Sequence, residues 1–186
     1  PSVSHSNYAT SIGNQWMPDG GRCPGLLGNN FGTGAAGHGN LGRAHDTSGV
    51  FARDFWAAKL RDVTDGTSNT IALGEIRPLC GDHTQYHPWS HYNTLWIATV
   101  APINWPTCRR ELGGKDDTTG GAEDCNHFRA WNMSMGFKSR HPQGAHFVFA
   151  DGSVQFLPES IDYMTYQRLG CRRDGQFVGS LDPLGQ

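Results

Sequence analysis

The sequence has no long apolar stretch and carries few charges. Of its 186 residues, 17% are charged and 37% are hydrophobic, and the formal net charge is −2. No run approaches the ~18 apolar residues that a membrane-spanning helix needs. The charge balance also gives no basic surface of the kind that binds nucleic acid or an anionic membrane. We therefore expect no nucleic-acid partner and no direct membrane contact from the printed sequence.

The cysteines lack the spacing of a zinc ribbon or a redox motif. There are five of them and no C-x-x-C pair: Cys23, Cys80, Cys108, Cys125 and Cys171. Scattered cysteines are typical of disulfides in an exported protein, but an odd number leaves the pairing open. Cys108 and Cys125 are the nearest pair, and the segment between them has little apolar content to hold itself. We therefore expect a bridge between these two residues.

Glycine is abundant, at 25 residues, which favours many turns and short strands over long helices. The length fits a single domain over residues 1–186. Residues 1–50 are a loop-rich start, and residues 104–140 are an excursion that precedes a C-terminal unit at 141–179. The fold class that we predict is α+β, mainly β, with an antiparallel sheet, a C-terminal hairpin and short helices.

The hairpin is predicted from His141 to Leu157, where two apolar runs flank Asp151-Gly152. An Asp-Gly pair between such runs is typical of a two-residue turn that needs positive φ. In that register Phe149 faces Val154, and Phe147 faces Phe156. Strand alternation then places the side chains of all four residues on one buried face.

Three stretches of the sequence each match a motif of one known protein family. His141 is followed after nine residues by Asp151-Gly152, which resembles the terminal H-x9-DG motif of the family. The segment Asp62–Glu75 resembles the central DGTSNT…GE motif, and Ser6–Ala9 resembles an upstream SNYAG-like element. The residues that match these two longer motifs are His141, Asp151, Gly152, Asp65, Gly66, Ser68, Asn69 and Glu75. With these motifs in this order, the sequence resembles the DUF1559 family of bacterial prepilin-like proteins.

The resemblance implies a pilin- or pseudopilin-like globular domain of an exported protein, at the bacterial cell surface or outside the cell. Family members begin with an apolar N-terminal helix, which would be the contact with the membrane and which the printed sequence lacks. The implied function is a non-enzymatic structural subunit of a fibre. Its partners would be copies of itself, with secretion or pilus machinery as further candidates. We expect the contacts between copies in the loops Gly28–Gly39 and Asp116–Asp124.

An acidic loop offers a candidate ion site. Its four carboxylates, in a turn-rich stretch, are Asp116, Asp117, Glu123 and Asp124. Oxygen ligands suit calcium, although the spacing does not match an EF-hand loop. We consider calcium as the cofactor here, with a solvated acidic loop as the alternative. A second candidate, the trio His83, His87 and His91, has helical ligand spacing but is interrupted by Pro88, which opposes a continuous helix.

Two other functional classes stay open. A secreted module that binds glycans or ions would use exposed tryptophans and the acidic loop. A hydrolase would need a nucleophile, a base and an acid, and Ser68, His141 and Asp151 have the right residue types. The sequence has no G-x-S-x-G elbow, and the hairpin places Asp151 at its tip and His141 beyond the far end of a strand. We therefore expect no enzyme.

Overall fold

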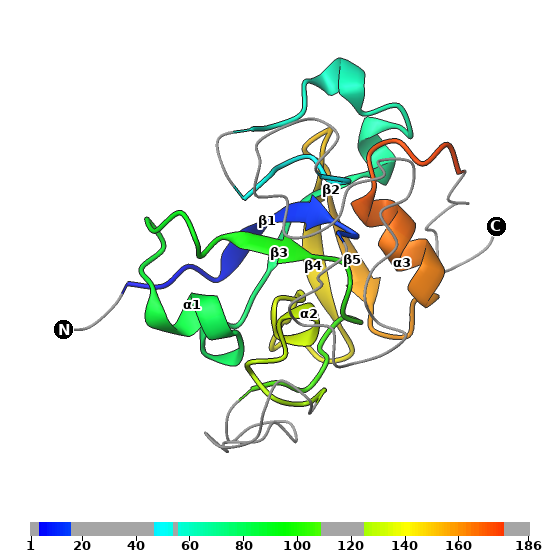
Figure 1. Cartoon of the computed structure of the whole chain (residues 1–186). Coiled ribbons are helices and arrows are strands. Elements are labelled where there is room, and N and C mark those ends of the chain that lie inside the picture. The colour runs from blue at the N-terminus through cyan, green and yellow to red at the C-terminus, as the bar shows by residue number, and fades with distance from the viewer. Residues whose placement is uncertain (1–3, 16–46, 54–55, 109–124, 177–186) are drawn as a thin grey trace.

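The computed structural model describes residues 4–15, 47–53, 56–108 and 125–176. Five strands form one sheet in the order β3-β1-β2-β4-β5, flanked by short helices (Figure 1). The strands are β1 Tyr8–Gly13, β2 Ile71–Glu75, β3 Trp96–Ala98, β4 Gly144–Phe149 and β5 Val154–Pro158. The α+β prediction is confirmed. None of the helices in these ranges is both long and apolar enough to cross a membrane.

The sheet is mixed, which corrects the prediction of an antiparallel one. Strand β2 lies at its centre and pairs antiparallel with β1 and β4, and β5 continues the antiparallel order. Strand β3 runs parallel to β1, with Thr10 opposite Trp96. The segment after β3 turns away, so this strand is limited to Trp96–Ala98. A parallel neighbour needs a long connection, and residues 14–95, which include β2, connect β1 to β3.

The short helices lie between the strands. Three single-turn 3-10 helices are η2 Leu60–Asp62, η3 Thr67–Asn69 and η4 Pro78–Cys80, and the α-helices are α1 Asp82–Tyr86, α2 Trp131–Ser134 and α3 Tyr163–Gly170. Pro158 ends β5, and helix α3 begins after a short turn at Tyr163. Its N-cap is Asp162, whose carboxylate accepts a hydrogen bond from the backbone N–H of Thr165 at 2.8 Å.

The main core lies on the face of the sheet that α3 covers. Phe147 of β4 meets Tyr166 of α3 with ring centroids 6.1 Å apart, and it meets Phe137 at 5.1 Å. Both contacts are edge-to-face, the arrangement that aromatic rings favour. Phe149 and Leu157 are also buried on this side. The predicted burial of Phe147 and Phe149 is therefore confirmed.

The register of the hairpin differs from the prediction by one residue. Phe147 lies opposite Gln155, and His146 lies opposite Phe156. The loop has three residues, 150–152, and Gly152 alone among them has positive φ, at 88°. A one-residue slip turns a strand over. Val154 and Phe156 are consequently 63% and 44% exposed, so their predicted burial is wrong, and Leu157 is buried in their place.

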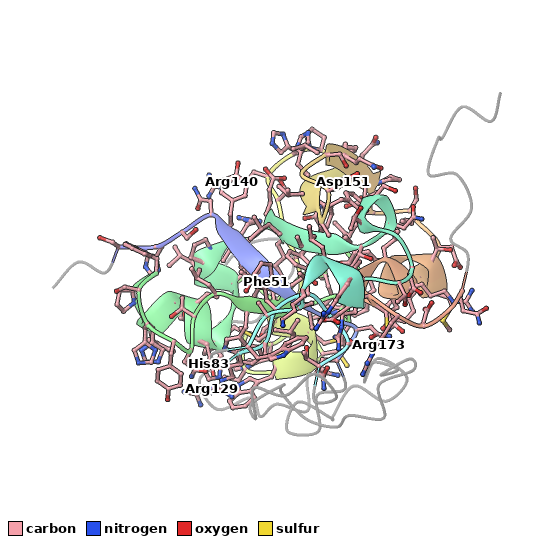
Figure 2. All side chains as sticks on the ribbon, turned by 90° about the horizontal axis from the view of Figure 1, so that it is seen from above. Phe51, His83, Arg129, Arg140, Asp151 and Arg173 are labelled. Atoms are coloured by element: carbon pink, nitrogen blue, oxygen red, sulfur yellow. A yellow bond between two sulfur atoms is a disulfide. The ribbon has the colours of Figure 1, made fainter. Side chains whose placement is uncertain are left out.

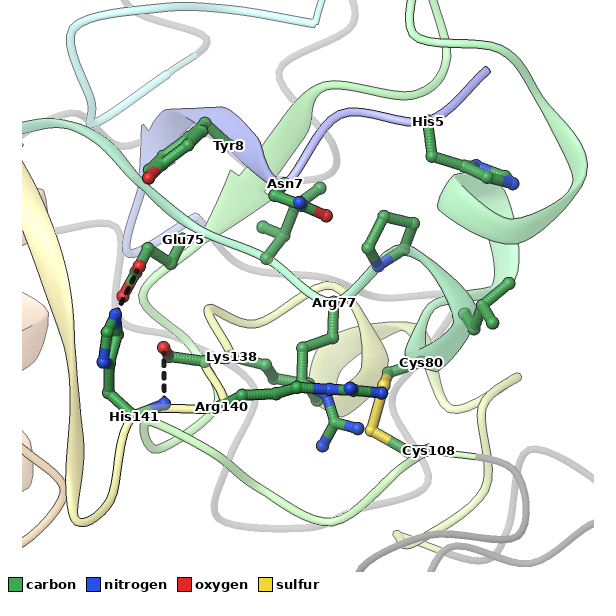
Figure 3. A pocket seen from close by; sticks show the side chains of 14 residues that line it. His5, Asn7, Tyr8, Glu75, Arg77, Cys80, Cys108, Lys138, Arg140 and His141 are labelled. Atoms are coloured by element: carbon green, nitrogen blue, oxygen red, sulfur yellow. Dashed lines mark hydrogen bonds and ion pairs between the residues drawn. A yellow bond between two sulfur atoms is a disulfide. The ribbon is translucent and has the colours of Figure 1, made fainter. Parts of the chain in front are cut away.

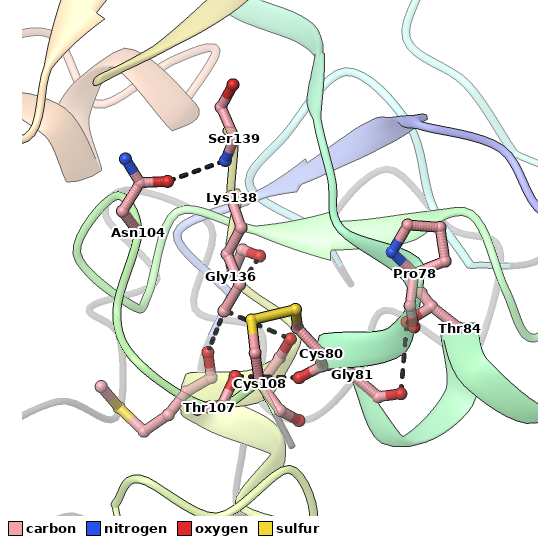
Figure 4. Close-up of a disulfide and its surroundings, with 12 residues drawn as sticks. Pro78, Cys80, Gly81, Thr84, Asn104, Thr107, Cys108, Gly136, Lys138 and Ser139 are labelled. Atoms are coloured by element: carbon pink, nitrogen blue, oxygen red, sulfur yellow. Dashed lines mark hydrogen bonds between the residues drawn. A yellow bond between two sulfur atoms is a disulfide. The ribbon is translucent and has the colours of Figure 1, made fainter. Parts of the chain in front are cut away.

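The predicted Cys108–Cys125 bridge is also wrong. Cys108 is bonded to Cys80, at a sequence separation of 28. The bridge ties η4 to the segment after β3, and the hydroxyl of Thr107 donates to the Cys80 carbonyl at 2.8 Å beside it (Figure 4). Cys125 is disulfide-bonded as well, and Cys171 is a buried thiol. Proximity in sequence failed as a guide because the segment after β3 returns to η4, where Cys80 lies.

Candidate functional site

The motif residues meet at the two ends of the pairing between β2 and β4. At one end, the backbone N–H of Asp151 donates to the Thr67 carbonyl at 3.1 Å, and that of Ala150 donates to Thr70 at 2.8 Å. At the other end, Nε2 of His141 lies 3.3 Å from Oε1 of Glu75. The two ends of the C-terminal motif are therefore attached to the two ends of the central motif.

The Glu75 carboxylate is the centre of a hydrogen-bonded cluster. Its side chain is 12% exposed, and Oε2 accepts the backbone N–H of His146 at 2.7 Å. Burial by itself raises the pKa of this carboxyl. Hydrogen bonds from the His146 backbone and the Ser139 hydroxyl, together with the imidazoles of His141 and His146, outweigh burial and lower the pKa below its ordinary value. Glu75 is therefore an anion at neutral pH.

Two imidazole rings converge on this anion. Nδ1 of His146 lies 3.5 Å from Oε2 of Glu75, and the rings of His141 and His146 pack edge-to-face with centroids 4.7 Å apart. One ligating atom from each of the three side chains lies within 4.8 Å of the other two. The His141 and His146 side chains are 53% and 41% exposed. The cluster, Glu75–His141–His146, is thus open to solvent on one side.

A cavity of about 700 Å³ opens beside this cluster. Glu75 and His141 stand on one of its walls, and Arg77 and Arg140 lie side by side towards the Cys80–Cys108 disulfide (Figure 3). Burial and then the charge of Arg140 lower the pKa of Arg77. A second cavity shares Arg77, Arg140 and His141 with the first. Guanidinium groups recognise carboxylates and phosphates, so this wall has the chemistry of an anion-binding surface.

Lys138 lies beneath the same cavity. It is 2% exposed, and its ammonium donates to the carbonyls of Met133 at 3.0 Å and Gly136 at 3.3 Å (Figure 4). Burial and the charge of Arg77 lower the pKa of Lys138 to about 7. The ammonium therefore holds the turn after α2 by hydrogen bonds to its buried carbonyl groups. The backbone N–H of Lys138 also donates to the Glu75 carbonyl at 3.0 Å.

The remaining motif residues form turns. Asn69 donates to the Asp65 carbonyl at 3.3 Å and the Thr70 hydroxyl to the Gly66 carbonyl at 3.0 Å, while Gly66 has a φ of 99°. The carboxylate of Asp65 reaches a distant segment, where it accepts the backbone N–H of Gly175 at 3.0 Å. Ser68 is exposed in η3.

Asp151 hydrogen-bonds within its own turn and accepts the backbone N–H of Ser153 at 2.8 Å. Hydrogen bonds from the Ser153 hydroxyl and backbone lower the pKa of the Asp151 carboxyl. Strand β4 lies between Asp151 and His141, so the structure does not assemble Ser68, His141 and Asp151 into a triad. The hydroxyl of Ser139 lies near an acid and an imidazole, but it bonds to the Glu75 carboxylate.

The histidine trio does not converge on one point. His87 and His91 stack with centroids 4.2 Å apart, whereas His83 and His87 are 6.5 Å apart, and His83 instead contacts Trp131 at 4.5 Å. In Figure 2, His83 and Arg129 lie on the opposite side of the view from Arg140 and Asp151. The calcium candidates Asp116, Asp117, Glu123 and Asp124, and the loop Gly28–Gly39, lie outside the described residues.

Four residues of the site were missed in the sequence. Arg77, Lys138, Ser139 and His146 join the motif residues through the fold. A signal for His146 was present, since strand alternation already placed it on the face opposite Phe147. The others lie in segments without periodicity, so no pattern singled them out.

A comparison with known protein families gives one match. The family model described as "Protein of unknown function (DUF1559)" matches residues 10–163. No curated protein and no solved structure matches the chain. The matched span includes the cluster Glu75–His141–His146 and the hairpin turn.

Proposed function

The chain belongs to the DUF1559 family, and on that basis we propose that it is the globular domain of an exported, non-enzymatic subunit of a pilin- or pseudopilin-like fibre. Its location would be the cell surface or the extracellular space. The Cys80–Cys108 disulfide supports export, because such bridges persist in oxidising compartments. The observation that carries the proposal is an exposed apolar face of the sheet.

This face follows from the strand registers. Leu73, Val148 and Val154 lie opposite one another across β2, β4 and β5, so their side chains share the face that points away from α3. Val154 is 63% exposed and Phe156, two residues along β5, is 44% exposed. Tyr8 of β1 lies opposite Glu75 and is 56% exposed. The exposed sheet face is defined here as Tyr8, Leu73, Val148, Val154 and Phe156.

The face reaches an edge of the sheet. Within the described strands β5 pairs with β4 alone, so its outer side offers unpaired backbone groups next to exposed apolar side chains. An apolar patch at a sheet edge is a typical protein contact surface. When such a patch meets a different patch on an identical subunit, repetition gives an open helical filament instead of a closed dimer.

Electron microscopy of the native material, together with light scattering of the purified full-length protein, tests the proposal. We expect filaments, and we expect Phe156→Lys to reduce their number or length by placing a charge in the contact. Leu60→Lys is the matched control, since Leu60 is 71% exposed in η2, away from the sheet face. A monomer at high concentration, without filaments in the native material, would defeat the proposal.

A secreted ion-binding module is the second candidate. It is favoured by the carboxylate–imidazole cluster and by the guanidinium groups on the adjoining cavity wall. A hydrolase has weaker support, since the Ser139 hydroxyl is held by the carboxylate and not by an imidazole base.

A further inference from the structure

We propose that Glu75, His141 and His146 form a binding site for a divalent transition-metal ion, and that this ion is zinc. Two imidazole nitrogens and one carboxylate are a ligand set that zinc accepts, with a fourth position left for water or another ligand. The proposal does not rest on fibre formation, although the site shares a face of the sheet with Tyr8 and Phe156.

The distances between the ligating groups are close to those around a tetrahedral ion. With metal–ligand bonds of about 2.0–2.2 Å, ligand atoms in a tetrahedron are about 3.3–3.6 Å apart. Glu75 Oε1 and His141 Nε2 are 3.3 Å apart, and Glu75 Oε2 and His146 Nδ1 are 3.5 Å apart. These two distances involve different oxygens of the carboxylate, so one ion needs rotations of the side chains to bring both imidazoles to it. One ligating atom from each of the three residues lies within 4.8 Å of the other two, which keeps these rotations small.

The surroundings hold the ligands in place. The Glu75 carboxylate is oriented by the backbone N–H of His146 and by the Ser139 hydroxyl, and Ser139 Oγ also accepts the backbone N–H of His141 at 3.0 Å. The ring of His146 packs edge-to-face on Phe156 with centroids 5.1 Å apart. Such second contacts fix ligand orientation at metal sites. Because both imidazoles are about half exposed, the ion can enter from solvent.

Other clusters fit a metal less well. Asp65, Cys171 and Asp174 also bring three possible ligands together, but Asp65 is occupied by two backbone N–H groups, and burial raises the pKa of the Cys171 thiol to about 12. A thiol must lose its proton to bind a metal. The stacked rings of His87 and His91 lie parallel, with an interplanar angle of 9°, so they do not aim at a common point.

Isothermal titration of the metal-free full chain with Zn²⁺ tests the site. We expect one ion per chain and an affinity that falls by more than about tenfold in His141→Ala and in His146→Ala, since even loss of a supporting contact costs about 10–100-fold. The affinity of His91→Ala, which removes a histidine of the stacked pair, should equal that of the wild type. Circular dichroism checks that each variant is folded.

Visible absorption of bound Co²⁺ is a second, independent test of the same site. Co²⁺ in the wild-type chain should show the visible absorption of a four-coordinate ion, and His141→Ala should lose it. His141 is half exposed, so this variant keeps the fold even where Glu75→Gln disturbs it. Equal zinc affinity in wild type and His141→Ala, loss of binding in His91→Ala, or no binding at all would overturn the proposal.

Discussion

The backbone N–H of His146 donates to the Glu75 carboxylate at 2.7 Å across a sequence separation of 71 residues. This bond joins the end of β2 to β4 and places the His146 ring beside the same carboxylate. The side chain of Glu75, at the end of β2, thus accepts a backbone hydrogen bond from β4. His141 approaches the same carboxylate from the segment that precedes β4. These contacts between β2 and β4 both stabilise the sheet and form the centre of the candidate site.

Removing this carboxylate should destabilise the fold. Glu75→Ala leaves the His146 N–H and the Ser139 hydroxyl without their acceptor, and an unsatisfied buried donor costs about 1–3 kcal/mol. Urea unfolding of metal-free protein measures the free energy of unfolding. Glu159→Ala is the matched control, because Glu159 is exposed, and we expect a change of about 0.5 kcal/mol or less there. Equal effects in both variants would contradict the role of Glu75.

Lys138 should give the stability of the protein an alkaline pH dependence. The pKa of Lys138 is about 7 in the folded chain, against 10.5 as its ordinary value. Between these values the unfolded chain binds more protons than the folded chain, so the free energy of unfolding rises with pH. Relative to Lys138→Met, the wild type should gain about 2 kcal/mol between pH 7 and pH 9.

The readout for Lys138 is the slope of this difference with pH, measured by urea unfolding at several pH values. The slope is unaffected by the constant cost of the carbonyls that Lys138→Met leaves without their donor. Below pH 7 the difference between the two proteins should level off, because Lys138 is then protonated in both states. A difference that is constant from pH 7 to pH 9 would contradict the lowered pKa.

The Cys80–Cys108 bridge should contribute substantially to stability. It closes a separation of 28 residues, and the chain-entropy relation gives about 3–4 kcal/mol for a loop of that size. Replacing both cysteines with serine should lower the free energy of unfolding by about that amount.

Peptide mapping after alkylation without reductant should locate the Cys171 thiol only once the protein is denatured, since it is buried. Alkylation of Cys80 or Cys108 under those conditions would contradict the bridge.

Gly152 should tolerate asparagine better than valine. It has a φ of 88°, and an added Cβ would meet nothing within 4 Å, so the cost of a substitution comes from the backbone conformation alone. A β-branched residue in that conformation costs about 1–3 kcal/mol, whereas asparagine adopts it more readily. Thermal unfolding of Gly152→Val and Gly152→Asn compares the two. Equal loss in both variants would mean that crowding, and not φ, limits this position.

The sequence was sufficient for the elements that depend on local pattern. The paired apolar runs around Asp151-Gly152 predicted the hairpin. The turn type was not decidable locally, because an Asp-Gly pair suits a two-residue loop and also a three-residue loop with glycine last. The structure selects the longer loop, in which the N–H groups of Ala150 and Asp151 bind the carbonyls of Thr70 and Thr67.

The candidate site was predicted only as separate motifs. His141 and Glu75 were both singled out, but the sequence contains no register between β2 and β4, so their contact could not be inferred. The prediction of the disulfide failed for the same reason, since Cys80 and Cys108 are brought together by packing between segments 28 residues apart in sequence. Long-range pairing, not local preference, assembles both the cluster and the bridge.

The register of β5 leads to a prediction about two adjacent residues, Phe156 and Leu157, because it buries one of them and exposes the other. Leu157 is 2% exposed in the core, and Phe156 is 44% exposed on the sheet face. Leu157→Ala should therefore cost about 2–5 kcal/mol, the range for a buried leucine. Phe156→Ala removes a larger side chain yet should cost less, because most of what it loses is contact with the His146 ring. The two-residue loop would reverse this order, since it would place Phe156 in the core opposite Phe147. Urea unfolding of the two variants distinguishes the registers, and a Phe156→Ala loss larger than that of Leu157→Ala would exclude the three-residue loop.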